Sequence, residues 1–399
     1  MKKKTALVLA GGAARGAYEV GVVDYVLREV AKEVGPISFD ILCGTSVGAL
    51  NACAIAAFAD QGALAVEKLV SVWTSLDVSK LVALDLRGFF GFSSGWLTRK
   101  KPEVPMREGG LIDPSGLEKL ITDSIPFDRI ATNLKAGRVS AVSVSTTHVA
   151  SGKTVVFVQT ADGKLPRWSR DPTIEPRAAH ITAEHALASA AVPMLFRAVK
   201  IDGEYHCDGG LRQNVPLSPA RRLGADALLV VNPRRVDGSG LAESSKVAEE
   251  AFPSPFFLMG KTLNALLLDR IDTDLARLES INRILEAGTR VWGDSFCDQL
   301  NGSLGYRPGA GFRPMRATLV RASEDIGKMA AEYVHSAHFS RVKGMLGRLM
   351  RSIANSDSSN EADLLSYLLF DGEFAGRLIE LGRADAKARH SALCKFFAD

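Results

Sequence analysis

The sequence predicts an α/β protein in which helices cover both faces of a mostly parallel central sheet. The first observation is that strand-like and helical segments alternate over residues 5–59, in the order strand, helix, strand, helix. The second is that the runs at 5–10 and 227–232 are continuously apolar, as strands buried on both faces are. The third is a globular composition, with 46% hydrophobic and 24% charged residues over 399 positions.

Glycine and proline mark the ends of the first elements. Gly11 and Gly12 end the apolar run at 5–10, which is therefore expected to be a buried strand. Gly35 and Pro36 end a segment whose apolar side chains recur every three or four residues, as in a helix. The elements expected in this region are a strand at 5–10, a helix at about 17–34, a strand at 39–43 and an Ala-rich helix that runs to residue 59.

The middle of the chain is expected to hold short strands and helices around one irregular segment. Residues 85–110 mix glycine with large apolar side chains at no clear period, which indicates an exposed loop or a lid. Asp113 is expected to cap a short helix that begins at Pro114. The further elements expected here are strands at 139–144, 154–159, 199–201, 205–207 and 227–232, and helices at 114–124 and 181–191.

The character of the chain changes after about residue 235. The segment 237–240, Asp-Gly-Ser-Gly, indicates a linker, and apolar residues then recur along one stripe of a long helix at 256–287. Further helices are expected near 324–335, 341–353 and 362–369. We therefore expect two domains, an α/β domain at residues 1–235 and a mainly helical C-terminal extension at residues 236–399.

Charge and hydropathy exclude several classes of protein. The net charge of +4 is small for this length, and no nucleic-acid-binding signature occurs. No apolar run approaches the roughly 20 residues of a transmembrane helix, and the short apolar run at the start is expected to be the first strand rather than a signal peptide. The five cysteines include no Cys-x-x-Cys pair, so reduced thiols in a cytoplasmic protein are expected.

The first motif that carries chemistry is Gly44-Thr45-Ser46-Val47-Gly48. It lies between a predicted strand and an apolar helix, which is the context of a sharp turn that exposes a serine hydroxyl. Glycines relieve crowding at such a turn, and the helix N-terminus favours negative charge beside the hydroxyl. Ser46 is therefore the candidate nucleophile, and the alternative is that it only caps the helix.

The second motif is Gly11-Gly12-Ala13-Ala14-Arg15-Gly16, which opens a helix directly after the first strand. Consecutive backbone N–H groups in such a loop can converge on an anion. A nucleotide phosphate is one candidate, but the glycine spacing matches neither the dinucleotide fingerprint nor the Walker pattern. The anion is therefore expected to be the oxyanion formed during acyl transfer. Arg15 can either stabilise this charge or brace the turn.

The third motif is Asp208-Gly209-Gly210, whose glycines let the chain bend so that a carboxylate can approach another residue. Histidine is the usual base for a serine, yet none of the histidines lies in a recognisable strand-end context. Asp208 is therefore the candidate base, with an ordinary turn as the alternative. The seven histidines are His148, His180, His185, His206, His335, His338 and His390.

Taken in order, these motifs resemble those of the patatin-like phospholipases, a family of serine acyl hydrolases with a Ser–Asp dyad. The family's glycine-rich loop, Gly-x-Ser-x-Gly motif and Asp-Gly-Gly/Ala motif correspond to residues 11–16, 44–48 and 208–210. The segments 189–196 and 214–216 also resemble the family on either side of the aspartate. The resemblance covers about residues 5–235 and implies a three-layer patatin-like α/β fold, with the C-terminal helical extension added to it.

The resemblance also implies a site and a mechanism. Ser46 attacks an ester carbonyl and Asp208 accepts its proton, with no metal or cofactor. The backbone N–H groups of Gly12 and Ala13, together with Gly11 or Ala14, are expected to hold the oxyanion. Ala13 stands where the strictest family loop has a third glycine, and alanine keeps the donor provided that the residue does not need a positive φ. The supporting residues are Arg15, Gly16, Gly44, Gly48, Gly209 and Gly210.

A phospholipid or lysophospholipid substrate implies contact with a lipid surface. The aromatic segments 89–96 and 252–259 are candidates for insertion, and Arg87 and the basic run at 99–101 flank the first of them. A hydrophobic contact within the protein is the alternative for each. We expect a cytoplasmic protein with transient peripheral contact at the inner face of the membrane, and no nucleic-acid partner.

Two other functions stay open at this point. A carboxylesterase with a histidine-containing triad would make one histidine indispensable and would leave the glycine-rich loop and Asp208 unexplained. A regulated partner-binding protein would fold normally and turn over substrate only with an activator.

Overall fold

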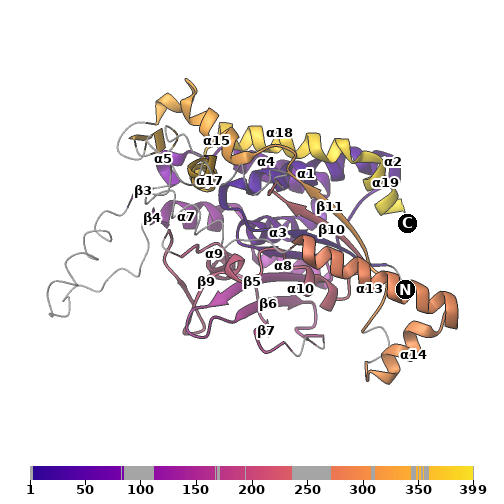
Figure 1. Ribbon diagram of the computed structural model, residues 1–399. Coiled ribbons are helices and arrows are strands. Elements are labelled where there is room, and N and C mark those ends of the chain that lie inside the picture. The colour runs from indigo at the N-terminus through magenta and orange to yellow at the C-terminus, as the bar shows by residue number, and fades with distance from the viewer. Residues whose placement is uncertain are drawn as a thin grey trace.

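The computed structural model has three layers, a central β-sheet between two layers of helices (Figure 1). The three-layer α/β class expected from the sequence is confirmed. The structure describes residues 3–81, 83–84, 112–166, 168, 171–193, 195–235, 271–306, 311–342, 347–348, 350–351, 354 and 359–398.

Among the described residues the central sheet has nine strands, in the order β11-β10-β1-β2-β5-β6-β7, with β9 paired to both β5 and β8. The pairs from β11 to β5 are parallel, whereas β6 and β9 each run antiparallel to β5. The strand bounds are β1 Thr5–Leu9, β2 Ile41–Thr45, β5 Ala141–His148, β6 Thr154–Thr160, β7 Ile174–Ala178, β8 Val199–Ile201, β9 Glu204–Asp208, β10 Ala227–Asn232 and β11 Arg316–Arg321, with a separate pair β3 Ala83–Leu84 and β4 Ile112–Asp113.

Helices follow most of the parallel strands and cover the sheet. Their bounds are α1 Gly16–Tyr25, the π-helical turn η2 Val26–Val30, α2 Ala31–Val34, α3 Val47–Ala57, α4 Ala63–Thr74, α5 Val78–Leu81, α7 Ser115–Ser124, α8 Asp128–Lys135, α9 Ala183–Ser189, α10 Leu217–Arg222, α13 Ile271–Trp292, α14 Phe296–Ser303, α15 Ile326–His335, α17 Ser359–Leu368, α18 Gly372–Ala388 and α19 His390–Ala398. Short 3₁₀ turns lie at Ala13–Arg15, Ala59–Gln61, Gly209–Leu211 and Phe339–Arg341.

Strand β1 shows how one apolar run fills two cores. Successive side chains of a strand point to opposite faces of the sheet. Leu7 and Leu9 therefore join the larger core, which includes α1, α3 and α18, whereas Ala6 and Val8 join a smaller core under α10 and α13. Because both faces are covered, the strand has to be apolar at every position, which is why the sequence shows a continuous run rather than an alternation.

The C-terminal part of the chain completes this architecture. Strand β11 pairs in parallel with β10 at the edge of the sheet, and α18 lies along α1 (Figure 1). The two helices approach so closely that a Cβ atom at Gly21 would collide with the carbonyl of Ile379, and one at Gly382 with the carbonyl of Tyr18. The division at residue 235 stays a prediction, and the described residues on its two sides share one sheet.

Most of the expected elements are present with bounds shifted by a few residues. The strands predicted at 5–10, 39–43, 139–144, 154–159, 199–201, 205–207 and 227–232 correspond to β1, β2, β5, β6, β8, β9 and β10. The structure adds elements that we did not predict, which are β3, β4, β7, β11, α4, α5, α8, α10, α14, α18 and α19. The irregular segment 85–110, the linker 237–240 and the aromatic segments 89–96 and 252–259 lie outside the described residues.

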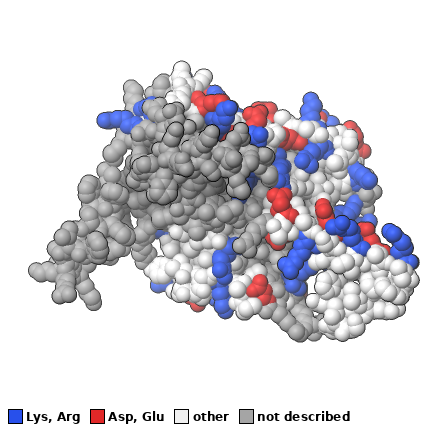
Figure 2. Space-filling model, in the orientation of Figure 1, with Lys and Arg blue, Asp and Glu red and all other residues white. Residues whose placement is uncertain are grey.

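Two further observations concern the surface charge and the hydropathy of the described helices. On the face shown in Figure 2, basic and acidic side chains of the described residues are interspersed, in keeping with the small net charge. Within the described segments, no helix combines the length and the apolar character that crossing a bilayer requires.

Candidate active site

Ser46 lies on the sharp turn between β2 and α3, as its motif predicted. Its backbone has φ 54° and ψ −130°, a left-handed conformation that costs a non-glycine residue about 1–2 kcal/mol. The flanking glycines allow this turn to pack tightly: a Cβ at Gly44 would collide with the carbonyl of Gly48, and a Cβ at Gly48 would lie 2.5 Å from the carbonyl oxygen of Leu9. The turn therefore holds the hydroxyl at the N-terminus of α3 in one orientation.

The carboxylate of Asp208 lies directly against this hydroxyl. Ser46 Oγ donates a hydrogen bond to Asp208 Oδ2 at 2.6 Å, and the N–H of Gly210 donates to Asp208 Oδ1 at 2.7 Å. Asp208 ends β9, and its backbone N–H donates to the carbonyl of Ala191 at 2.9 Å. Thr147 Oγ1 donates to the carbonyl oxygen of Asp208, also at 2.9 Å, so the residue is held through both its backbone and its side chain.

The environment of Asp208 changes its acidity. The side chain is fully buried, and burial raises the pKa of Asp208 to about 7, against the opposing effect of the hydrogen bonds from Ser46 and Gly210. A carboxyl group whose pKa lies near neutrality can take up and return a proton at comparable cost, which suits a general base.

The sequence reasoning missed Ser189 as an individual contact, although the segment that contains it was among the family resemblances. The N–H of Ser46 donates to Ser189 Oγ at 2.8 Å, and Ser189 Oγ donates to the carbonyl of Ser145 at 2.6 Å. This buried serine therefore ties the turn to strand β5. Its partners lie 143 and 44 residues away along the chain, so no local pattern could have shown the contact.

The glycine-rich loop lies beside the serine turn and has three amides without an acceptor among the described residues. The N–H of Gly11 donates to the carbonyl of Asn214 at 3.2 Å, so this amide is engaged within the protein. In the part of the chain that the structure describes, the N–H groups of Gly12, Ala13 and Ala14 donate to no protein acceptor. Of the four residues expected to hold the oxyanion, Gly11 therefore has its amide engaged, whereas the amides of Gly12, Ala13 and Ala14 are not engaged by a described acceptor.

Ala13 adopts φ 49°, so this position does require a positive φ. The sequence analysis accepted alanine in place of the third glycine on the condition that no positive φ was needed. The structure does not meet that condition: alanine keeps the donor here but carries the steric cost of the left-handed region.

Asn51 connects the loop's helix to the serine's helix, and the sequence analysis did not single it out. Its Nδ2 donates to the carbonyl of Gly16 at 3.0 Å and to the carboxylate of Glu19 at 2.9 Å, while Trp73 Nε1 donates to its Oδ1 at 3.1 Å. Burial raises the pKa of Glu19 well above its ordinary value. This network fixes the start of α1 against α3, and so positions the two motifs relative to each other.

Arg15 points away from the serine and into the C-terminal part of the chain. Its Nε donates to Ser366 Oγ at 2.8 Å, and its guanidinium carbon lies 4.2 Å from the centre of the Tyr367 ring. Only 6% of the residue is exposed. Of the two roles considered for Arg15, these contacts correspond to bracing, and they join the glycine-rich loop to α17.

All seven histidines lie in described segments, and each contacts a group other than Ser46 or Asp208. His206, two residues before Asp208, is buried with Nδ1 3.0 Å from Thr146 Oγ1, and burial lowers its pKa to about 4. The partners of the others are Ser151 for His148, Gln159 for His180, Thr182 for His185, the carbonyl of Ala354 for His335, Glu373 for His338 and Glu33 for His390.

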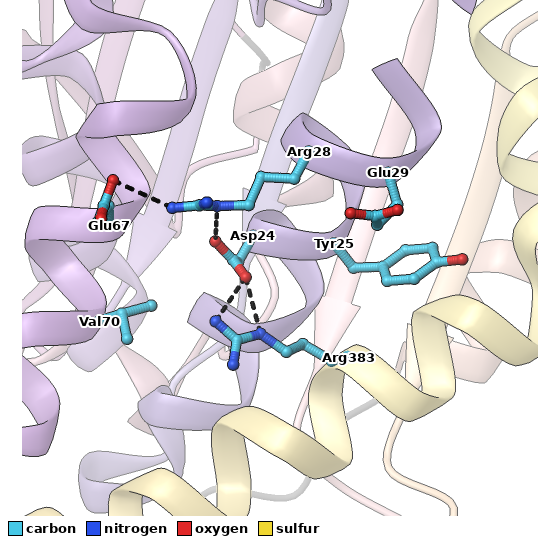
Figure 3. Close-up of a pocket in the computed structure, with 7 residues that line it drawn as sticks. All are labelled: Asp24, Tyr25, Arg28, Glu29, Glu67, Val70 and Arg383. Carbon is cyan, nitrogen blue, oxygen red and sulfur yellow. Dashed lines mark hydrogen bonds and ion pairs between the residues drawn. The ribbon is translucent and has the colours of Figure 1, made fainter. Parts of the chain in front are cut away.

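A cavity of about 480 Å³ lies elsewhere, between the α1–η2 segment, α4 and α18 (Figure 3). Its charged groups pair with one another, since Asp24 accepts hydrogen bonds from both Arg28 and Arg383, and Arg28 contacts Glu67. None of its lining residues belongs to the three motifs. The cavity is lined by Asp24, Tyr25, Arg28, Glu29, Glu67, Val70 and Arg383.

Comparison with known proteins identifies the family. A crystal structure of VipD from Legionella pneumophila is similar at a TM-score of 0.35 and 16% sequence identity, over 95% of this chain and 67% of that one. The sequence model of the family described as patatin-like phospholipase matches residues 7–221, more than half of the chain and all three motifs. The chain therefore belongs to the patatin-like phospholipase family and is in general terms a lipid acyl hydrolase.

Proposed function

We propose that this chain is a phospholipase A or lysophospholipase that cleaves carboxylic esters of lipids, with Ser46 as nucleophile and Asp208 as base. The observation that carries the proposal is the 2.6 Å hydrogen bond from Ser46 Oγ to Asp208 Oδ2 at the N-terminus of α3. It joins two residues that lie 162 positions apart and that the motifs select independently.

In the acylation step, Ser46 Oγ attacks the ester carbonyl carbon while its proton passes to Asp208 Oδ2. The carbonyl electron pair moves onto oxygen, and the resulting oxyanion faces the free N–H groups of Gly12 and Ala13. When the tetrahedral intermediate collapses, the bond to the alcohol oxygen breaks. The alcohol leaves with the proton from Asp208, and an acyl-Ser46 ester remains.

In the deacylation step, water attacks the acyl carbon and gives a proton to Asp208. Collapse of the second intermediate breaks the bond to Ser46 Oγ, which regains the proton, and a fatty acid is released. Asp208 is ionised again at the end of each half-reaction. A pKa near 7 therefore suits both the uptake and the return of the proton.

The dyad is favoured over a histidine triad because each histidine has another partner. His206 is the one nearest in sequence to Asp208, and its Nδ1 contacts Thr146 rather than Ser46 or Asp208. We therefore expect His206→Gln to keep measurable turnover, whereas a triad enzyme would lose it.

The experiment measures fatty-acid release from mixed phospholipid and lysophospholipid micelles in the presence of EDTA. We expect Ser46→Ala and Asp208→Ala each to lower kcat by about 10³-fold or more, and the double variant to lose little beyond either, because the two side chains act as a unit. The relative rates on the two micelle components assign the substrate class.

Exposed residues provide matched controls, since Ser71→Ala and Asp162→Ala make the same changes outside the site. Both controls should retain wild-type rates. Turnover that survives in folded Ser46→Ala would exclude the dyad. A folded wild-type chain that releases fatty acid only after an activator is added would support the regulated alternative.

A further inference from the structure

Three metal-ligating side chains of different chemistry meet on the surface of the α1–η2–α2 segment, away from Ser46 and Asp208. Glu33 comes from α2, and His390 and Cys394 come from α19, the C-terminal helix. One ligand atom from each lies within 4.8 Å of the other two. Helices α2 and α19 lie side by side in Figure 1, and 357 residues of sequence separate Glu33 from His390.

The spacing on α19 accounts for two of the three ligands. His390 and Cys394 are four residues apart, so both side chains lie on the same face of the helix, one turn apart. Leu393 and Phe396, on the flank of α19 next to this face, are buried and anchor the helix. The helix therefore presents the imidazole and the thiol together towards α2 without depending on the cluster for its own packing.

The distances within the cluster match the edges of a tetrahedral zinc site. With Zn–S of about 2.3 Å and Zn–N and Zn–O of about 2.0–2.2 Å, ligand atoms at tetrahedral angles lie about 3.5 Å apart for S···N and S···O, and about 3.3 Å for N···O. Cys394 Sγ is 3.4 Å from His390 Nε2 and 3.5 Å from Glu33 Oε2. His390 Nε2 is 2.8 Å from Glu33 Oε1, the other oxygen of the same carboxylate, so the carboxylate has to turn to offer one oxygen to the ion, and the N···O edge has to lengthen by about half an ångström.

A fourth residue, Tyr25, contacts His390 through the ring nitrogen that the cluster does not use. The hydroxyl of Tyr25 lies 3.0 Å from His390 Nδ1, the ring nitrogen that faces away from the cluster. Histidines that bind metals through Nε2 usually donate their Nδ1 proton to an oxygen, and the Tyr25 hydroxyl oxygen lies where it can accept that proton once Nε2 binds a metal. Tyr25 also lines the cavity in Figure 3, but its ring points away from the ion pair between Asp24 and Arg383.

The charges of the cluster favour a cation. Hydrogen bonds from His390 and Cys394 lower the pKa of Glu33, so this carboxylate is ionised at neutral pH. A divalent cation bound here would be attracted to this carboxylate and would replace the proton of the neighbouring Cys394 thiol.

We propose that Glu33, His390 and Cys394 bind a zinc ion, with water as the fourth ligand, and that the ion fastens α19 to α2. A thiolate and an imidazole select zinc over magnesium or calcium, and three protein ligands with one open position are an established zinc arrangement. This site is independent of the ester chemistry, since it lies on different elements from the serine turn.

The test uses the full chain, freed of metal with a chelator and titrated with Zn²⁺ against a chromophoric chelator. We expect one zinc per chain, a zinc-dependent rise in Tm, and at least a roughly tenfold loss of affinity in Cys394→Ser and in His390→Gln. Cys297→Ser is the matched control, because Cys297 is also a partly buried free cysteine but lies on α14. It should bind zinc like the wild type.

Co²⁺ in place of Zn²⁺ reports the thiolate ligand directly in the wild-type chain. We expect a thiolate-to-cobalt charge-transfer absorption in the wild type and in Cys297→Ser, and none in Cys394→Ser. Absence of stoichiometric zinc binding by the wild type would overturn the proposal. So would a wild-type cobalt spectrum without the thiolate band, or full zinc affinity in both Cys394→Ser and His390→Gln; the cobalt result does not depend on the folding of any variant.

Discussion

At the scale of single residues, the candidate site combines strain with an unfavourably buried charge. Ser46 and Ala13 both adopt positive φ without being glycine, and Asp208 is a fully buried carboxyl group with a raised pKa. Each of these features costs stability, and each lies where the proposed chemistry needs a nucleophilic hydroxyl, a free amide or a base.

Asp208 should control the dependence of the rate on pH. Since the ionised form is the base, kcat/KM is expected to rise with a slope of about one and to level off above about pH 7, the pKa of this group. The measurement is kcat/KM for a soluble ester at a series of pH values, with the folded fraction checked at each. A rate that is already maximal at about pH 5 would show that the base titrates near the ordinary value of an aspartate.

The raised pKa of Asp208 should also make the stability of the protein depend on pH. The pKa of Asp208 is about 7 in the folded chain and near 3.8 in the unfolded chain, so the folded state is favoured below pH 3.8 and loses this contribution as pH rises towards 7. Asp208→Asn is therefore expected to raise the free energy of unfolding by on the order of 2 kcal/mol at pH 8, and by much less near pH 4. Urea unfolding at the two pH values measures this, and an equal effect at both would contradict it.

Ala13 offers a test of backbone strain. Ala13→Gly removes the steric cost of φ 49° but adds chain entropy to the unfolded state, so the free energy of unfolding should rise by about 0.5–1 kcal/mol. The neighbouring substitution Ala14→Gly is the control, because Ala14 has no positive φ and should lose stability. If both variants were destabilised equally, the left-handed backbone of Ala13 would carry no strain.

At the scale of elements, the site is assembled by helices that begin where parallel strands end. Helix α3 begins directly after Ser46, and α1 begins directly after the glycine-rich loop. Asn51 joins these two helices through Gly16 and Glu19, and Arg15 joins the loop to α17 through Ser366. The loop is therefore supported from inside the fold and from the C-terminal part of the chain.

The contact between Arg15 and Ser366 should influence turnover without touching the substrate. Ser366→Ala removes an acceptor for a buried guanidinium, so the loop amides should lose part of their alignment and kcat should fall by about 3–10-fold at a nearly constant KM. Ser366→Thr keeps the hydroxyl and should restore kcat, while Ser280→Ala on the exposed side of α13 should change nothing. A loss of stability with unchanged kcat would leave Arg15 a purely structural role.

At the scale of the whole molecule, the central sheet contains strands from both the N-terminal and the C-terminal part of the chain. Strand β11 continues the parallel order beyond β10, and α18 packs on α1 through the close approach at Gly21 and Gly382. The segment after residue 235 was expected to be a mainly helical extension. In the structure its described residues also supply an edge strand and part of the larger core.

The elements that the sequence analysis missed share a physical cause. β11 includes Arg316, Thr318 and Arg321 and is only partly buried, so its residues do not form the apolar run that revealed β1 and β10. β7 contains Pro176, which argues against a strand, yet it pairs at the open edge of the sheet where a missing N–H is tolerated. The conformation of edge strands and of the C-terminal helices depends on the elements they pack against. Those elements are distant in sequence, so a local sequence pattern does not reveal them.

What the sequence determined by itself is local: the continuous strands at β1 and β10, the glycine-flanked turn at Ser46, the glycine-rich loop and Asp208 as the candidate base. The tertiary structure alone decided which groups meet and in what environment. It set the 2.6 Å dyad distance, the burial that raises the pKa of Asp208, the contact of Arg15 with Ser366 and the cluster at Glu33. These properties depend on distances and desolvation between residues far apart in the chain, and such quantities exist only once the layers have packed.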